Sequence, residues 1–468
     1  MENKNRGRPE LLGADATLLQ PIVATRSSFF HLALVLLGFT SFAFFAWLHQ
    51  LRWGLGTTGL NVPVYWGSYI TNFVFFIGIS HAGTLISAIL RLCHAEWRRS
   101  ITRAAEVITV LVLFFGVGSI IVDLGRPDRM LNVLKHPNFR SPLLWDVCSV
   151  STYLLASSIY LYLPLIPDIA LLRDYAGKYT GFYRLLALGW QGTPRQWRVL
   201  NRAISVMAVL VIPIAISVHT VVSWVFGMTV QPMWHSTIFG PYFVVGAIFS
   251  GIASLIIAMA LIRRIYFLQD YLKEIHFRHL GTLLLVFALL WFYFTFAEHL
   301  TTYYGHDPAH LAVFYSKLAG RYAPLFWGMV LTCLVIPVGI LARRRTRPIR
   351  SAVVASVSVL VGMWLERFTI VIPTLAAPRV PWARVSYSPT WVELGITLGF
   401  SATFIFLYMV FTKFFPIVSI WEVQEGREAA LTEVAERVKS YLPGPDVAGG
   451  AEVADGSVPE LSRREGVG

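Results

Sequence analysis

The sequence predicts an all-α, polytopic membrane protein with about ten transmembrane helices. Of its 468 residues, 56% are hydrophobic and only 14% are charged, whereas about 25% of the residues in a soluble domain are charged. The apolar residues also form long blocks, and about 20 apolar residues in a helix cross a bilayer. The predicted spans are 29–50, 64–92, 102–123, 143–166, 199–222, 239–266, 278–299, 323–342, 350–372 and 388–412.

The segments around these spans divide the chain into six parts. They are a polar, basic cytoplasmic tail at 1–28, a flanking helix with its outer loop at 29–63, four-helix bundles at 64–230 and 239–375, a second flanking helix at 388–414, and a cytoplasmic amphipathic helix with a flexible tail at 415–468. No cleavable signal is expected before the first span. The amphipathic helix is predicted over 421–442, with one face formed by Trp421, Val434, Val438 and Leu442.

Basic residues in the loops predict the orientation. With the N-terminus on the cytoplasmic side, loops on that side hold nineteen Lys and Arg residues and loops on the other side hold nine. The positive-inside rule then predicts that both termini are cytoplasmic. The net charge of +13 follows from this topology. A nucleic-acid partner is not expected because the chain has no soluble basic face.

Two sets of motifs predict an internal repeat. Trp66–Tyr69 at the start of the second span is similar to Phe239–Tyr242 at the start of the sixth, and Pro142–Val147 is similar to Pro324–Met329 in the fourth and eighth. Four spans separate the copies, so the repeats would be parallel, with an axis along the membrane normal. The alternative is that aromatic residues recur at membrane interfaces without any duplication.

Ionisable residues within the spans gather in the predicted outer half. Each costs about 2.5–3.5 kcal/mol near a helix centre, so such residues are usually functional. The outer group consists of Asp123, Asp146, His219, Glu298, Glu366 and Glu393. Glu106 lies near the cytoplasmic end of the third span and His81 near the middle of the second. This distribution predicts a proton-handling site that opens to the outer face, although Glu298 and Glu366 could instead pair with Arg367 and loop cations.

Structural interpretations compete with the functional one at three of these positions. Asp146 lies one turn inside the fourth span, where a carboxylate also favours the helix dipole. Asp123 could form an ion pair with Arg126 that holds the hairpin between the third and fourth spans. A lone buried histidine such as His81 often hydrogen-bonds to a neighbouring helix.

The cysteines exclude two kinds of metal centre. Only Cys93, Cys148 and Cys333 are present, and they are widely spaced. An iron–sulfur cluster normally takes four thiolates, and a structural zinc site takes closely spaced ligands. We therefore expect no metal in this chain, and any iron–sulfur chemistry would belong to a partner.

Several motifs resemble a known family. Asp123–Pro127, followed by Ser141 and Pro142, resembles the NrfD-like, or polysulfide-reductase, membrane subunits. Longer stretches look closer to one branch, the ActC subunit of bacterial alternative complex III. These are 72–88, 138–146, 217–223, 295–302, 366–368 and 389–393.

The resemblance implies a cofactor-free subunit of the bacterial inner membrane that binds and oxidises menaquinol or ubiquinol near the outer face. Electrons would pass to an iron–sulfur protein on that face and then to multihaem c-type cytochromes, and a homologous NrfD-like subunit would share the complex. Protons would be released outside. The chain departs from the family at Asp123, where relatives often carry His, and at Val225, where they carry an acid.

Quinol oxidation releases two electrons and two protons, so the site needs a base near each ring oxygen. We predict that Asp146, with Asp123 or His81, accepts the protons. Arg126 would set the charge of Asp123. The ring would be held by an aromatic wall of Trp66, Tyr69, Phe73 and Trp145. The candidates for a proton path are Glu106, His219, Glu298 and Glu366.

Two other functions fit parts of the sequence. A haem b quinol dehydrogenase needs facing histidines at matched depth, and the predicted depths of His81 and His219 do not match. A proton-coupled secondary transporter also permits parallel repeats and buried carboxylates. Against a transporter, no span is expected to have a core broken by Gly or Pro.

Overall fold

The computed structural model describes residues 16–23, 25–81, 83–175, 179–343, 349–379 and 385–441. All the regular secondary structure in these residues is helical. Ten helices or helix pairs are long and apolar enough to cross a membrane. The predicted fold class is therefore confirmed. The spans are α2 (Ser27–Trp53), α3–α4 (Ser68–Ser80 and Thr84–Leu92), α5 (Thr102–Asp123), α7 (Pro142–Tyr175), α9 (Pro194–Gly227), α10 (Phe239–Ile265), α11 (Glu274–Gly305), α13–α14 (Ala323–Val330 and Ile336–Leu341), α15 (Ile349–Ala376) and α16 (Trp391–Phe414).

The helices outside the spans were not predicted, except for the amphipathic helix near the C-terminus. α1 (Ala16–Val23) lies in the predicted polar tail, yet Leu18 and Leu19 are buried. The other unexpected helices are α6 (Asn132–Lys135), α8 (Thr180–Leu186) and α12 (Pro308–Leu318). α17 (Ile420–Tyr441) matches the predicted amphipathic helix.

The chain forms two units, residues 1–423 and 424–468. In the second unit, Val434 is exposed. The side chain of Val438 and all of Leu442 lie outside the described residues, so the predicted apolar face of α17 stays a prediction. The ten spans all belong to the first unit.

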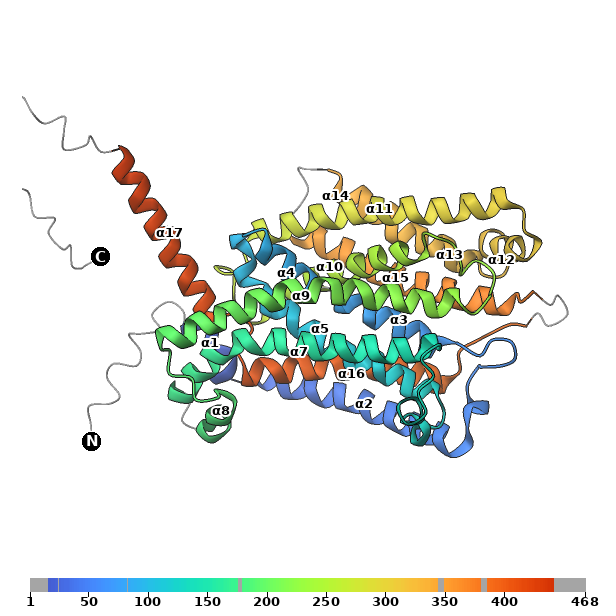
Figure 1. The fold of residues 1–468 in the computed structure, drawn as a ribbon, viewed down its shortest axis with the longest axis horizontal. Helices are drawn as coiled ribbons and strands as arrows, with labels where there is room; N and C mark the ends of the chain where they lie inside the picture. The colour runs from blue at the N-terminus through green and yellow to red at the C-terminus, as the bar shows by residue number, and fades with distance from the viewer. Residues whose placement is uncertain are drawn as a thin grey trace, which may run out of the picture. The chain divides into compact units, whose positions relative to one another are not determined.

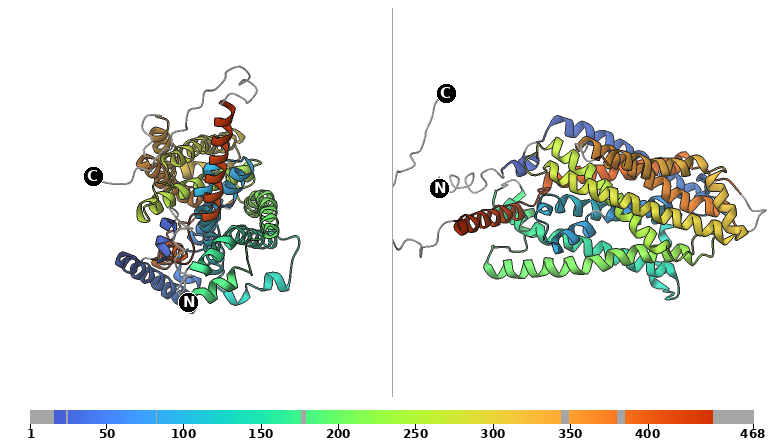
Figure 2. Two further views of the ribbon diagram at one scale, coloured as in Figure 1. Left: turned by 90° about the vertical axis from the view of Figure 1, so that its left-hand side faces the viewer. Right: turned by 90° about the horizontal axis from the view of Figure 1, so that it is seen from above.

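The long helices of the first unit run along a common direction (Figures 1 and 2). α3 packs on α5, α5 on α7, α7 on α9, and α9 on α4; we call these the first bundle. α10 packs on α11 and α15, and α14 packs on both α11 and α15; these helices and α13 are the second bundle. α2 packs along α16, so the first and last spans lie side by side (Figure 1). The internal repeat itself stays a prediction.

Contacts within the first unit define two ends. At the hairpin end, where residues 124–141 join α5 to α7, the Gln50 side chain near the end of α2 donates to the Val122 carbonyl near the end of α5 (2.8 Å). The start of α16 also meets the start of α3 there, because Ser68 Oγ donates to Glu393 (2.9 Å). The opposite end holds the loop between α4 and α5.

The second span is broken between α3 and α4, contrary to the prediction that no span has a broken core. At the break, the Gly83 amide donates to Thr109 Oγ1 (3.0 Å), and the Ser80 carbonyl accepts from Thr109 and from the Tyr153 hydroxyl. A Cβ on Gly83 would lie 2.0 Å from the Ala105 carbonyl oxygen, so only glycine lets α5 approach this closely. Backbone groups freed inside a membrane need such partners.

A buried ion pair holds the opposite end together. Arg103 on α5 pairs with Asp168 on α7, and both side chains are nearly inaccessible. Arg103 also donates to the carbonyl of Pro164 (2.8 Å), and Asp168 accepts from the backbone amide of Ile420 (3.1 Å) at the start of α17. One pair therefore connects three helices.

We expect Arg103→Ala to lower the free energy of unfolding by about 3–5 kcal/mol, because it leaves the Asp168 carboxylate buried without its cation. Arg126→Ala is the control, since Arg126 forms an exposed pair with Asp128. Thermal unfolding of the purified complex measures both. Equal melting temperatures for the two variants would contradict this account of the pair.

Candidate functional site

Asp146 lies in the first turns of α7, at the hairpin end. Pro142 begins the helix, where its missing N–H costs nothing. The Trp145 indole N–H donates to the Phe139 carbonyl (2.8 Å) and fixes the loop before it. Asp146 is only 6% exposed, and its Oδ1 has no hydrogen-bond partner among the described residues. An unsatisfied buried carboxylate is costly, so it suggests a missing partner.

Asp123, at the end of α5, is half-buried and also has an unpartnered oxygen, Oδ1, within the described chain. The expected pairing with Arg126 is wrong. Gly125, at a φ of 62°, turns the chain away from α5, and Arg126 is largely exposed and forms a two-pronged ion pair with Asp128 at 3.0 Å. Arg126 therefore does not set the charge of Asp123 in this structure.

Glu393 has a structural role. Its carboxylate accepts from the amides of Gly59 (2.7 Å) and Thr390 (3.1 Å), from Ser68 Oγ and from the Tyr387 hydroxyl. The Thr390 contact is half of a capping box that begins α16. Both oxygens of the Glu393 carboxylate therefore have hydrogen-bond partners, and these bonds connect the start of α16 to the start of α3.

The four aromatic residues predicted to hold the quinol ring contact different parts of the structure. Tyr69 is buried, and its hydroxyl donates to Gln50 Oε1 (2.6 Å). Trp66 stacks on Trp234, in the loop between α9 and α10, with ring centroids 5.9 Å apart, and it also contacts Phe226 on α9. Phe73 is buried in the main core, and Trp145 contacts the hairpin. Tyr69 is the wall residue that lies toward Asp123, because its partner Gln50 also donates to the carbonyl of Val122, the residue before Asp123.

His81 and His219 meet in the core. The rings are edge to face with centroids 4.0 Å apart, both residues are fully buried, and His81 Nε2 lies 3.0 Å from the Ala215 carbonyl oxygen. The prediction of different depths is wrong because the break after α3 places His81 beside α9. The contact leaves no room for a porphyrin between the rings, so this pair does not fit a haem. Both nitrogens of His219 lack a hydrogen-bond partner within the described chain.

Polar side chains continue from His81 toward the opposite end of the first bundle. The ring of Tyr153 lies 5.7 Å from that of His81, and its hydroxyl is 2.5 Å from Thr84 Oγ1. Seven residues on, the Tyr160 hydroxyl lies 3.3 Å from Ser87 Oγ, and Ser87 donates to the buried carboxylate of Glu106 (2.7 Å). Asp146, Tyr153 and Tyr160 are spaced by seven and therefore share one face of α7.

Glu366 and Arg367 on α15 form a buried pair with N and O 3.0 Å apart, as the structural alternative allowed. Arg367 also lies over the Phe243 ring, 4.8 Å from its centroid, and interacts electrostatically with both core histidines. A Cβ on Gly246 would lie 2.7 Å from Arg367 Nη2. Arg367 was not among the predicted site residues, but its place in an apolar span next to Glu366 was a usable signal.

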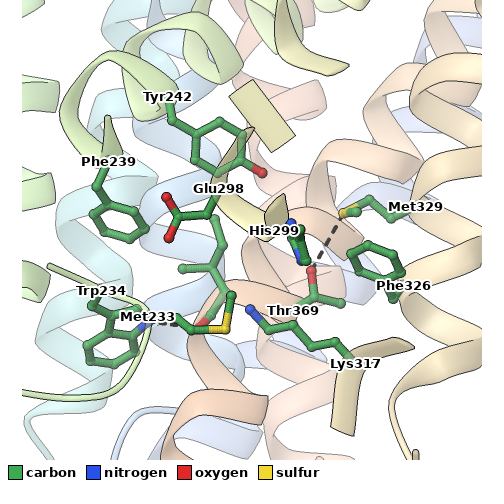
Figure 3. Close-up of a pocket in the computed structure, with 11 residues that line it drawn as sticks. Met233, Trp234, Phe239, Tyr242, Glu298, His299, Lys317, Phe326, Met329 and Thr369 are labelled. Atoms are coloured by element: carbon green, nitrogen blue, oxygen red, sulfur yellow. Dashed lines mark hydrogen bonds between the residues drawn. The ribbon is translucent and has the colours of Figure 1, made fainter. Parts of the chain in front are cut away.

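Glu298 lies in the second bundle, lining a cavity of about 20 Å³ with Lys317, His299 and Tyr242 (Figure 3). Ser236 donates to Glu298 (2.5 Å). Lys317 on α12 is buried, and burial lowers the pKa of its ammonium to about 8, although Glu298 and Glu366 act to raise it. Such a volume suits about one water molecule, so it cannot hold a quinone ring. Lys317 was expected to be a loop cation because α12 was not predicted.

The described residues hold no group of three or more His, Cys, Asp or Glu placed to bind a metal ion. Ten apolar spans that pack around a hydrophobic core with buried polar groups define a multi-pass, α-helical membrane protein. Residues 56–379 match the family described as Polysulphide reductase, NrfD. The match covers more than half of the chain, which therefore belongs to this family.

Three known proteins are similar over most of their length. The chain is 28% identical to a putative dimethyl sulfoxide reductase membrane subunit from Halobacterium salinarum, over 80% of this chain and 88% of that protein. It is 24% identical to an Hdr-like menaquinol oxidoreductase integral membrane subunit from Archaeoglobus fulgidus, over 85% and 95%. It is 22% identical to a selenate reductase subunit from Mesobacillus selenatarsenatis, over 79% and 89%.

The lowered pKa of Lys317 predicts a pH dependence of stability. An unfolded lysine keeps its proton to about pH 10.4, whereas the folded pKa of Lys317 is about 8. Between these values the unfolded state binds more protons, so the contribution of Lys317 to stability rises with pH. The melting temperature of the wild type minus that of Lys317→Met should therefore increase from pH 7.5 to pH 10.

The control for this measurement is Lys273→Met, because Lys273 is exposed. Its difference from the wild type should stay constant over the same pH range. A difference for Lys317→Met that is equally constant would mean that Lys317 titrates as a solvated lysine.

Proposed function

We propose that this chain is the quinol-oxidising membrane subunit of a respiratory or photosynthetic oxidoreductase of the alternative complex III type. The observation that carries the proposal is the buried, unpartnered carboxylate oxygen of Asp146 at the hairpin end. A quinol hydroxyl is a suitable donor to such an oxygen. The similarity to a protein named as a menaquinol oxidoreductase subunit supports the substrate class, menaquinol or ubiquinol.

Asp146 accepts one proton in this proposal, and Asp123 or His81 accepts the other. Oxidation removes two protons and two electrons from the quinol and leaves the quinone, so a second base is required. Asp123 has an oxygen without a described partner at the same end of the first bundle. Because Arg126 pairs with Asp128, its role is at the mouth of the site and not at the Asp123 carboxylate.

The second bundle is proposed to bind no quinol. Gly328 occupies the place in the Pro-Leu-Phe-Trp-Gly motif that Asp146 occupies in the first bundle. Two acids remain there: Glu298 already accepts from Ser236 and lies near Lys317, and Glu366 is paired with Arg367. One quinol per subunit follows, bound among α3, α5 and α7.

The electrons leave the subunit in this proposal, because it assigns the chain no redox centre. An iron–sulfur protein on the hairpin end would receive them and pass them to multihaem c-type cytochromes, and a homologous NrfD-like subunit would complete the membrane part. The excess of basic residues in the other loops supports an outward-facing hairpin end in a bacterial inner membrane. Protons from the quinol would then appear outside.

The polar side chains between His81 and Glu106 are proposed as a proton path through the first bundle. Thr84 and Ser87 are three residues apart on α4, so they share a face, and Tyr153 and Tyr160 contact them from α7. Hydroxyl groups both donate and accept, so they can relay a proton. Glu298 and Glu366 lie in the second bundle and would serve a separate route.

Asp146→Asn should lower quinol-dependent reduction of a cytochrome c partner at least tenfold, because a positioned base typically contributes 10²–10⁴-fold. Assembly should be unaffected, since the Asp146 side chain makes no hydrogen bond through Oδ1 to the described residues. Asp270→Asn, at an exposed acid in the loop between α10 and α11, is the control. Turnover of Asp146→Asn within twofold of the control, in an assembled complex, would remove Asp146 from the mechanism.

Glu106→Gln tests the path separately from the quinol site. In vesicles of fixed orientation, the variant should move at most half as many protons per electron, while quinol oxidation stays within twofold of the wild type. Glu96→Gln is the control, because Glu96 is an exposed acid in the loop just before α5. Unchanged proton movement in Glu106→Gln would exclude this residue from the path.

A further inference from the structure

A groove of about 770 Å³ lies between α7 and α9, on the outside of the first bundle. Its lining from α7 is Ile159 and Leu163, and its lining from α9 is Arg195, Arg198, Val199, Arg202, Ala203, Val206 and Met207. The α9 positions recur every three or four residues, so they form one stripe along that helix. The groove is thus charged at the start of α9 and apolar farther along it.

The three arginines have no acidic partner within the part of the chain that the structure describes. Arg195, Arg198 and Arg202 are at least partly exposed, and none of the ion pairs among the described residues includes them. The first turn of α9 also has no acid. Three neighbouring cations without a counter-charge favour a bound anion, and guanidinium groups match phosphate geometry.

The apolar part of the groove favours a ligand with a hydrocarbon chain. From Arg195 to Met207 the stripe covers thirteen residues, which lie about 18 Å apart from first to last along the helix. Beyond Arg202 it is formed by Ala203, Val206 and Met207. Across it, Leu163 and Ile159 follow α7 one turn apart. An inorganic phosphate ion would contact only the charged end of the groove and would leave its apolar part unfilled.

From these features we infer that the α7–α9 groove binds an anionic phospholipid, with its phosphate among Arg195, Arg198 and Arg202 and one acyl chain along Ile159, Val206 and Met207. Basic pockets between transmembrane helices are suited to acidic lipid headgroups. A quinone would leave the three cations uncompensated because its ring is neutral. The site is separate from Asp146, which lies at the other end of α7.

The test uses the intact complex, delipidated in detergent and titrated with phosphatidylglycerol or phosphatidylcholine of identical chains. Native mass spectrometry counts the lipids retained. The variant Arg195→Gln, Arg198→Gln, Arg202→Gln should retain at least tenfold less phosphatidylglycerol than the wild type. The control is Arg184→Gln, Arg264→Gln, Arg278→Gln, which removes three arginines that do not line the groove and should stay within twofold.

A second pair of variants tests the acyl chain. Val206→Trp fills the groove and should reduce phosphatidylglycerol retention, whereas Val209→Trp, on the same helix outside the groove, should not. Equal retention of the two lipids, competition by millimolar inorganic phosphate, or an unchanged triple variant would overturn the inference. A density map with a helix of another subunit in the groove would also overturn it.

Discussion

The break in the second span is the feature on which the interior of the first bundle depends. A helix interrupted inside a membrane exposes backbone groups that need partners, and here Thr109 and Tyr153 supply them from α5 and α7. The same break turns His81 toward α9, where it meets His219. One local departure from helical geometry thus fixes how three helices pack and where the imidazole lies.

The buried acids differ in the number of hydrogen bonds that they accept, and this difference cannot be seen from residue type alone. Glu393 accepts four hydrogen bonds and holds α16 against α3. Asp146, at the same end of the molecule, leaves Oδ1 unpartnered among the described residues. Leaving a buried polar atom without a partner costs about 1–3 kcal/mol. The oxygens of Glu366 also lack a hydrogen-bond partner among the described residues, but Glu366 is paired with Arg367, whereas none of the described ion pairs includes Asp146. The contrast therefore assigns Glu393 to the scaffold and favours Asp146 as a ligand-binding group.

The sequence was sufficient for the spans because hydropathy is a local property that the membrane enforces. It was insufficient for the contacts, which depend on turns and on distant chain segments. Gly125 directs Arg126 to Asp128 instead of Asp123, and α12, hidden in a loop, buries Lys317 near Glu298. The break in the second span was not predicted either, although small residues, Ser80 and Gly83, flank it. Of the predicted site, the structure places Asp146, Asp123 and Tyr69 at one end and puts His81 deeper in the core.

Arg367 lies where the two bundles meet. α15 belongs to the second bundle but packs on α3 of the first, so the guanidinium lies against Phe243 while it acts on His81 and His219. Glycine at 246 leaves room for it, because a Cβ there would lie 2.7 Å from Arg367 Nη2. The same guanidinium pairs with Glu366 on its own helix, so one buried cation lies where the two bundles meet.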